Sequence, residues 1–129
     1  MSRVTSLYSF ACAGFAAAVV ARGTAGCFSE RVAGPGGPSA QELCNGTQPN
    51  VVRIRNYAFG PAELRVARGT VVTWANCDQD THTSTSDGGV WESGALTPLT
   101  TFQRTFDTAG TFPYHCTPHP GMQATIVVE

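Results

Sequence analysis

The stretch TFPYHCTPHPGMQATIVV, residues 111–128, consists of two runs rich in β-branched and aromatic residues on either side of a short loop. The loop contains Cys116, His119 and Met122 in a C-x2-H-x2-M spacing. Both runs have the length and composition of β-strands. Prolines on each side of the histidine restrict the backbone dihedrals, so we expect a stiff loop between two strand ends.

Similar short runs continue along the chain from residue 51, with turn residues between them. No segment shows a convincing helical period, although 90–98 has room for a single helical turn. Seven or eight short strands with polar turns predict an all-β, antiparallel-rich sandwich. We predict the strands at 51–56, 62–67, 70–76, 81–86, 101–106, 111–115 and 122–128.

The loop residues gain a fourth partner in His82, which lies 34 positions before Cys116. A thiolate, two imidazoles and a weak thioether are the donor set of blue-copper electron-transfer sites. Zinc also suits cysteine and histidine, but the thioether of Met122 favours copper. A cysteine–histidine hydrolase would need a base and an oxyanion site and would give Met122 no role. The donor set therefore predicts a copper site.

Two segments resemble the cupredoxins, the type 1 blue-copper proteins. FPYHCTPHPGM followed by ATIVVE is similar to their C-terminal copper loop, with the short spacing of amicyanin rather than the longer loop of plastocyanin. TVVTWANCDQDTHT is similar to the strand and loop that lead to the first histidine ligand. The resemblance covers about residues 50–129 and implies a Greek-key β-sandwich. It also implies one copper ion with His82, Cys116 and His119 as strong ligands and Met122 as the long axial ligand.

One position departs from the family pattern. Thr83 stands where amicyanin and plastocyanin have asparagine after the first histidine. In the family that asparagine helps to tie the two ligand loops together. We expect the Thr83 hydroxyl to make a similar but shorter link.

The resemblance implies a function in electron transfer. We expect a monomer that carries single electrons between redox partner proteins, which dock around His119. The alternative is a copper carrier or buffer that uses the same ligands to hand over the metal. The sequence contains no catalytic dyad or second metal site, so we predict no enzymatic activity.

The N-terminal residues 1–27 have the layout of an export signal, with one arginine, an apolar run and then small residues. TAGC, residues 24–27, resembles a lipobox, and we favour lipidation at Cys27. Ordinary cleavage at the small residues and an uncleaved anchor are the alternatives. We therefore expect a periplasmic protein or one anchored on the outer side of the cytoplasmic membrane.

Residues 28–50 are rich in Gly, Pro, Ser and Asn and are predicted to be a flexible linker before the copper domain at 51–129. If Cys27 carries lipid, Cys44 and Cys77 are the natural disulfide pair of an exported protein. The family topology argues against that pair, because it places the start of the first strand at the end opposite the ligands. Two free thiols remain the alternative.

The charge of the chain excludes one class of partner. Eight arginines and no lysine stand against nine acidic residues among the 129 residues, which gives a formal net charge of −1. Such a chain has no basic field to attract nucleic acid. A mildly acidic surface instead favours a protein partner with a basic docking patch.

Overall fold

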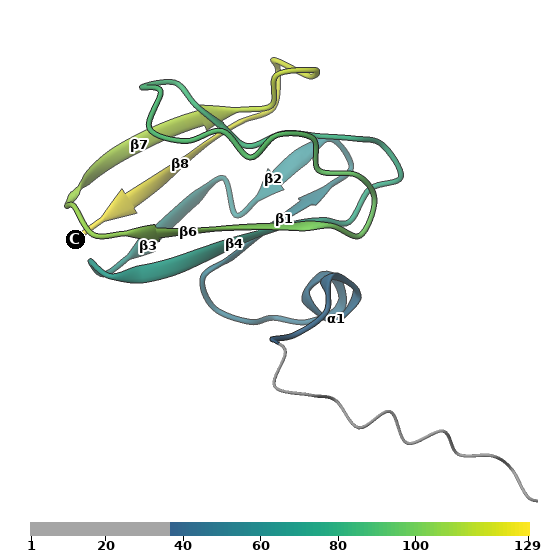
Figure 1. Ribbon diagram of the computed structural model, residues 1–129, viewed down its shortest axis with the longest axis horizontal. Coiled ribbons are helices and arrows are strands. Elements are labelled where there is room, and N and C mark those ends of the chain that lie inside the picture. The colour runs from purple at the N-terminus through teal and green to yellow at the C-terminus, as the bar shows by residue number, and fades with distance from the viewer. Residues whose placement is uncertain (1–36) are drawn as a thin grey trace, which may run out of the picture. The chain divides into compact units, whose positions relative to one another are not determined.

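The computed structural model describes residues 37–129, and Figure 1 shows their arrangement. The predicted export signal, Cys27 and the first part of the predicted linker lie outside the described residues. Within 37–129, no helix is long and apolar enough to cross a membrane. The elements are α1 (Ala40–Asn45), β1 (Val51–Arg55), β2 (Ala58–Gly60), β3 (Glu63–Val66), β4 (Thr70–Asn76), β5 (Thr85–Ser86), β6 (Thr101–Phe106), β7 (Gly110–His115) and β8 (Gln123–Val128).

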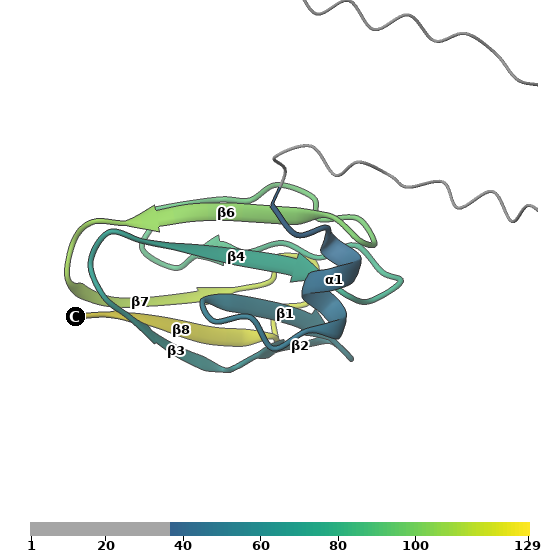
Figure 2. The same ribbon diagram turned by 90° about the horizontal axis from the view of Figure 1, so that it is seen from below.

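The strands form two four-stranded sheets that pack as two layers (Figure 2). One sheet has the order β2-β1-β4-β6 and the other β3-β8-β7-β5. From β2 to β7 successive strands alternate between the sheets, as in a Greek-key sandwich, and β7 and β8 form an antiparallel hairpin within one sheet. The predicted all-β sandwich is confirmed, but the sheets are mixed, since β1 pairs parallel with β4 and β3 parallel with β8.

The core lies between the two layers and is rich in aromatic side chains. Alternation along β8 produces this burial, because every second residue from Ala124 onward points inward. Trp74 of β4 is fully buried and packs edge to face on Tyr114 of β7, with ring centroids 5.7 Å apart. The partly buried Arg104 lies against this core, with its guanidinium 5.6 Å from the centre of the Trp91 ring.

The region of 81–98 differs from its prediction. Only Thr85–Ser86 of the predicted strand 81–86 pairs with β7. His82 instead forms an isolated bridge with Leu96, and no helical turn occurs in 90–98. The physical reason is that backbone N–H and C=O groups of 90–98 form hydrogen bonds with residues 82–86. This segment therefore needs no internal helical hydrogen bonds.

Helix α1 lies inside the range predicted to be a linker, so residues 40–45 belong to the folded domain. A capping box begins the helix, with the Ser39 side chain accepting from the Glu42 amide and the Glu42 carboxylate accepting from the Ser39 amide. Leu43 and Cys44 are buried with Val51 in a small second cluster. A helix of six residues is too short to show a helical period in a Gly- and Pro-rich sequence.

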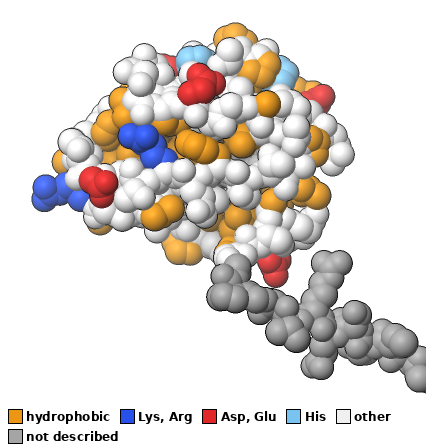
Figure 3. All heavy atoms as spheres, viewed as in Figure 1, with side chains coloured by type: hydrophobic (Ala, Val, Ile, Leu, Met, Phe, Trp, Pro, Cys, Tyr) orange, Lys and Arg blue, Asp and Glu red, His pale blue; other side chains and the backbone are white. Residues whose placement is uncertain are grey.

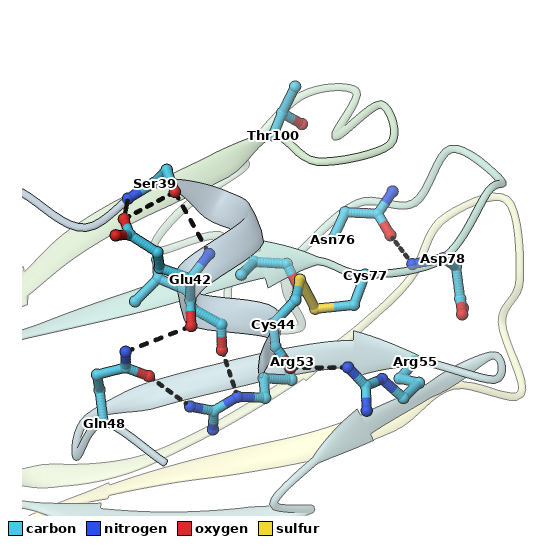
Figure 4. The surroundings of a disulfide bond; sticks show 12 residues. Ser39, Glu42, Cys44, Gln48, Arg53, Arg55, Asn76, Cys77, Asp78 and Thr100 are labelled. Carbon is cyan, nitrogen blue, oxygen red and sulfur yellow. Dashed lines mark hydrogen bonds between the residues drawn. A yellow bond between two sulfur atoms is a disulfide. The ribbon is translucent and has the colours of Figure 1, made fainter. Parts of the chain in front are cut away.

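A disulfide joins Cys44 to Cys77 (Figure 4). The side chains of Arg53 and Arg55 donate to the last carbonyls of α1, those of Leu43 (2.6 Å) and Cys44 (2.7 Å). These bonds lay α1 along β1 and bring Cys44 to the end of β4, where Cys77 follows. The topological argument against the pair was wrong, because the helix folds back from the start of β1.

Candidate metal centre

The loop between β7 and β8 is closed by three backbone hydrogen bonds. The His119 amide donates to the Cys116 carbonyl (3.2 Å), the Met122 amide to the His119 carbonyl (2.9 Å) and the Cys116 amide to the Met122 carbonyl (3.1 Å). The three loop residues predicted to be ligands are therefore bonded to one another through their backbones. Pro118 and Pro120 restrict the remaining dihedrals, so the loop has little freedom to open.

His82 is held by the segment that follows β4. Its backbone exchanges two hydrogen bonds with Leu96, of 3.0 Å and 2.8 Å, and its side chain is completely buried. Nε2 of the ring lies 3.2 Å from a carboxylate oxygen of Asp78. When Nε2–H donates to this carboxylate, Nδ1 keeps its lone pair, the arrangement that metal-binding histidines commonly show.

The potential donor atoms of three predicted ligands converge. Nδ1 of His82 lies 3.6 Å from Sγ of Cys116 and 3.1 Å from Nδ1 of His119, and Sγ lies 3.7 Å from Nδ1 of His119. Bonds of about 2.0–2.3 Å from three such donors to one ion place trigonal donors roughly 3.5–3.8 Å apart. Both sulfur-to-nitrogen separations fit that range, and the two nitrogens are somewhat closer.

The chemistry of these donors fits a soft cation. Lone pairs that face one another in a buried region are unfavourable unless a proton or a cation lies between them. The Thr83 amide donates a hydrogen bond of 3.4 Å to Sγ of Cys116. Met122 is buried at the end of the same loop, in one hydrophobic cluster with Cys116. Its thioether favours copper over zinc.

Thr83 links the two ligand segments as expected. Its hydroxyl accepts a hydrogen bond of 2.8 Å from the Thr117 amide, one residue beyond Cys116. The Thr85 hydroxyl lies 3.0 Å from that of Thr83 and 2.9 Å from that of Thr117. A chain of three hydroxyl groups therefore joins the segment of His82 to the loop of Cys116.

Asp78 is a site residue that the sequence did not reveal. Besides its contact with His82, its carboxylate accepts from the amides of Asn56 (2.6 Å) and Tyr57 (2.9 Å). Burial alone would raise the pKa of Asp78, but the two amides and the nearby His82 outweigh it and lower the pKa below its ordinary value. The only signal in the sequence was an acidic residue four positions before the histidine.

Asn76 is a second residue that the sequence did not reveal. It is completely buried at the end of β4. Its Nδ2 donates to the carbonyl of Asp80 (2.7 Å), two residues before His82, and to that of Leu96 (2.8 Å), the bridge partner of His82. A polar residue at the end of an apolar strand was the available signal, and its role is to fix the segment that carries His82.

Tyr57 lies against both histidine rings. Its ring centroid is 5.5 Å from that of His82 and 5.1 Å from that of His119, with interplanar angles of 82° and 89°. The Tyr57 hydroxyl donates to the Asp80 carboxylate, and this hydrogen bond is the main reason that its pKa lies above the ordinary value. The sequence contained no signal for this contact.

His115 is not part of this group, although it directly precedes Cys116 in the sequence. Its Nδ1 lies 2.6 Å from a carboxylate oxygen of Asp87, and the side chain is partly exposed. His115 therefore has a structural contact of its own. Figure 3 shows histidine surface on the upper part of the molecule, beside hydrophobic and acidic side chains, and arginine surface toward the left.

Comparison with known families gives a match over the whole β-sandwich. Residues 48–129 match the copper-binding proteins of the plastocyanin/azurin family. Amicyanin of Paracoccus denitrificans is 38% identical over 96 residues, which are 70% of this chain and 72% of that protein. Plastocyanin of Scenedesmus fuscus is 33% identical over 84 residues, 55% of this chain and 86% of that protein.

Solved structures show the same similarity. A reduced Cu(I) form of an amicyanin mutant has a TM-score of 0.62 at 33% identity and covers 70% of this chain and 90% of its own. A purple cupredoxin from Nitrosopumilus maritimus has a TM-score of 0.57 at 25% identity. The match covers 61% of this chain and 98% of that chain.

Proposed function

This chain belongs to the plastocyanin/azurin family of copper-binding proteins, and from that premise we propose that His82, Cys116, His119 and Met122 bind its copper ion. Copper as cofactor and blue-copper electron transfer as function follow from the family and from the amicyanin relatives. The observation that carries the ligand assignment is the convergence of two imidazole nitrogens and one thiol sulfur within 4.8 Å of one another.

Bound copper supplies one-electron chemistry by alternating between Cu(I) and Cu(II). The residues of this chain hold the site in one arrangement. Backbone hydrogen bonds fix the loop of Cys116, the Leu96 bridge fixes His82, and Thr83 joins the two segments. A site whose ligands are fixed before the electron arrives has little to reorganise, which favours rapid transfer.

We assign the electron entry and exit point to His119. Its side chain is partly exposed, whereas His82 and Cys116 are buried. Pro118 and Pro120 beside it are exposed and carry no charge. Docking of a redox partner on this surface would desolvate few polar groups, which suits a weak complex that dissociates quickly.

The charges around the site support a partner with a basic surface. Asp78 and Asp80 lie in the segment before His82, and Asp87 contacts His115 next to Cys116. Arg65, in contrast, pairs with Glu129 at the end of β8 that is remote from the ligand loop. This distribution would orient a basic partner toward the copper end of the sandwich.

The remaining proposals concern the state of the protein in the cell. We propose an exported monomer without enzymatic activity, anchored to the membrane if Cys27 is lipidated. The disulfide between Cys44 and Cys77 supports export, because such bonds persist in oxidising compartments. Mass spectrometry of the mature N-terminus tests the anchor, since a lipid on Cys27 adds mass and a free terminus at Gly26 or Phe28 excludes it.

The visible spectrum of the copper-loaded protein tests the site. We expect an intense blue band from thiolate-to-copper charge transfer, and Cys116→Ser should abolish it. A colourless protein that retains zinc in preference to copper would overturn the assignment. The copper-carrier alternative is tested by repeated reduction and reoxidation with a chelator present, because an electron carrier retains its copper and a metal carrier loses it.

A further inference from the structure

The two-residue turn between β1 and β2 has an unusual backbone. Asn56 and Tyr57 both have positive φ, 53° and 57°, between the paired residues Arg55 and Ala58. Such a turn requires the left-handed region at both positions, which asparagine tolerates and a bulky aromatic residue rarely adopts. Strained residues of this kind persist where the surrounding structure holds them, and they concentrate at functional sites.

Three contacts hold Tyr57 in this conformation. Its amide donates to Asp78, the carboxylate that also contacts Nε2 of His82. Its hydroxyl donates to Asp80, which lies two residues before His82. Its ring meets the rings of His82 and His119 nearly at right angles, the geometry that aromatic pairs prefer. The turn is therefore attached to the site through the backbone, the hydroxyl and the ring.

We propose that Tyr57 is a positioning residue of the copper site, which fixes the orientation of the two imidazole rings and shields them from solvent. The proposal rests on the assignment of His82 and His119 as ligands. Tyr57 is 51% exposed, whereas His82 is 0% exposed, so the phenol ring lies between the buried imidazole and the solvent. Residues that contact metal ligands orient those ligands and thereby affect metal affinity.

The effect should be greatest on His119. His82 has Asp78 at its other ring nitrogen, so one hydrogen bond already fixes its orientation. His119 is partly exposed and lies between two prolines of a short loop, and the Tyr57 ring is 5.1 Å away, centre to centre. Loss of the phenol ring would leave the His119 ring freer to rotate and would open a path for small molecules to the metal.

The test uses Tyr57→Gly, which removes the ring and relieves the positive φ, so the fold should be retained. Asn56→Gly is the matched control, because it introduces the same backbone freedom in the same turn. It keeps the Tyr57 ring and the backbone amides that donate to Asp78. Tyr57→Phe removes only the hydroxyl contact with Asp80. Each variant is loaded with copper, and copper affinity, the visible spectrum and the response to added imidazole are measured.

We expect Tyr57→Gly to lower copper affinity about tenfold, the lower end of the range for residues that contact metal ligands. Added imidazole should change its spectrum at concentrations that leave the unsubstituted protein and Asn56→Gly unaffected. Tyr57→Phe should retain the shielding and show a smaller loss of affinity. In the metal-free protein, ring-proton NMR signals of His119 should shift in Tyr57→Gly because the neighbouring ring current is lost.

Equal copper affinity and equal resistance to imidazole in Tyr57→Gly and Asn56→Gly would overturn the positioning role and leave the ligand assignment intact. Failure of the unsubstituted protein to bind copper would instead overturn the proposed function, and this inference with it. If Tyr57→Gly does not fold, Tyr57→Leu replaces it, and wild-type affinity and imidazole resistance in that variant would overturn the proposal in the same way.

Discussion

The Thr83 hydroxyl accepts a hydrogen bond of 2.8 Å from the Thr117 amide. Each residue directly follows a predicted copper ligand, His82 or Cys116. This single contact therefore joins two segments that are 34 residues apart in sequence.

Replacing Thr83 by valine should weaken this junction. Valine keeps the shape of the side chain but leaves the Thr117 amide without its acceptor, so the free energy of unfolding should fall by about 1 kcal/mol. Denaturant unfolding of the metal-free variants measures the change. Thr83→Ser retains a hydroxyl and should lose much less. Equal losses in the valine and serine variants would show that the hydroxyl is not the link.

His119→Gly should keep the fold and open the copper site. The residue is partly exposed on a loop closed by backbone bonds, so removal of its ring leaves a gap that solvent can enter. We expect the blue band to change, electron self-exchange to slow sharply and added imidazole to restore much of the original spectrum. A variant with an unchanged spectrum would show that His119 is not a ligand.

A charge at Pro120 should slow electron transfer without changing the copper site. Pro120 is exposed beside His119. A carboxylate there must be desolvated when the protein docks on a second copy or on its redox partner. We expect electron self-exchange of Pro120→Glu to slow while the blue band stays nearly the same.

The matched control for this charge is Thr108→Glu, an exposed position in the loop between β6 and β7. That loop precedes β7, whose other end carries the ligand loop. The control should exchange electrons at nearly the rate of the unsubstituted protein at high salt, where long-range repulsion is screened. Equal rates in both variants would place the exit of electrons away from His119.

Removal of the disulfide should destabilise the domain. The bond closes a loop with a sequence separation of 33 residues. Restricting the unfolded chain by a loop of that size stabilises the folded state by roughly 3–4 kcal/mol. Unfolding of the Cys44→Ser, Cys77→Ser double variant measures this loss. The blue band should persist, because Cys116 is the free cysteine among the described residues. An unchanged unfolding midpoint would show that α1 contributes little to the folded domain.

The start of α1 should lose stability in acid. The Glu42 carboxylate accepts hydrogen bonds from the Ser39 amide and then from the Ser39 side chain, and these lower its pKa below the ordinary value. A lowered pKa gives a contribution that is complete above the pKa of the unfolded chain, about 4.3, and is lost as pH falls through the folded-state value.

Hydrogen exchange of the α1 amides as a function of pH measures this effect. The difference in protection between the unsubstituted protein and Glu42→Gln should be constant above about pH 5 and shrink below about pH 4. A difference that does not depend on pH would show that the charge of Glu42 does not contribute to the cap.

The sequence by itself determined the loop of the candidate site and the class of the fold. The loop brings Cys116, His119 and Met122 close together in the chain, so their spacing and donor types could be recognised without a structure. The strands predicted at 70–76 and 122–128 also rested on local patterns, and the structure has strands at Thr70–Asn76 and Gln123–Val128. His82 could be proposed only together with the three donors of the loop, because a lone histidine in a polar segment has no chemical signature of its own.

Only the tertiary structure decided what surrounds the ligands. Asp78 contacts Asn56 and Tyr57 across 22 and 21 residues of sequence, and the fold brings these segments together because β1 and β4 are parallel neighbours. The same pairing lays α1 beside the end of β4 and makes the disulfide feasible. Local patterns report the burial and spacing of neighbouring residues. Contacts between side chains on different strands depend on sheet order and register, which a single sequence does not encode locally.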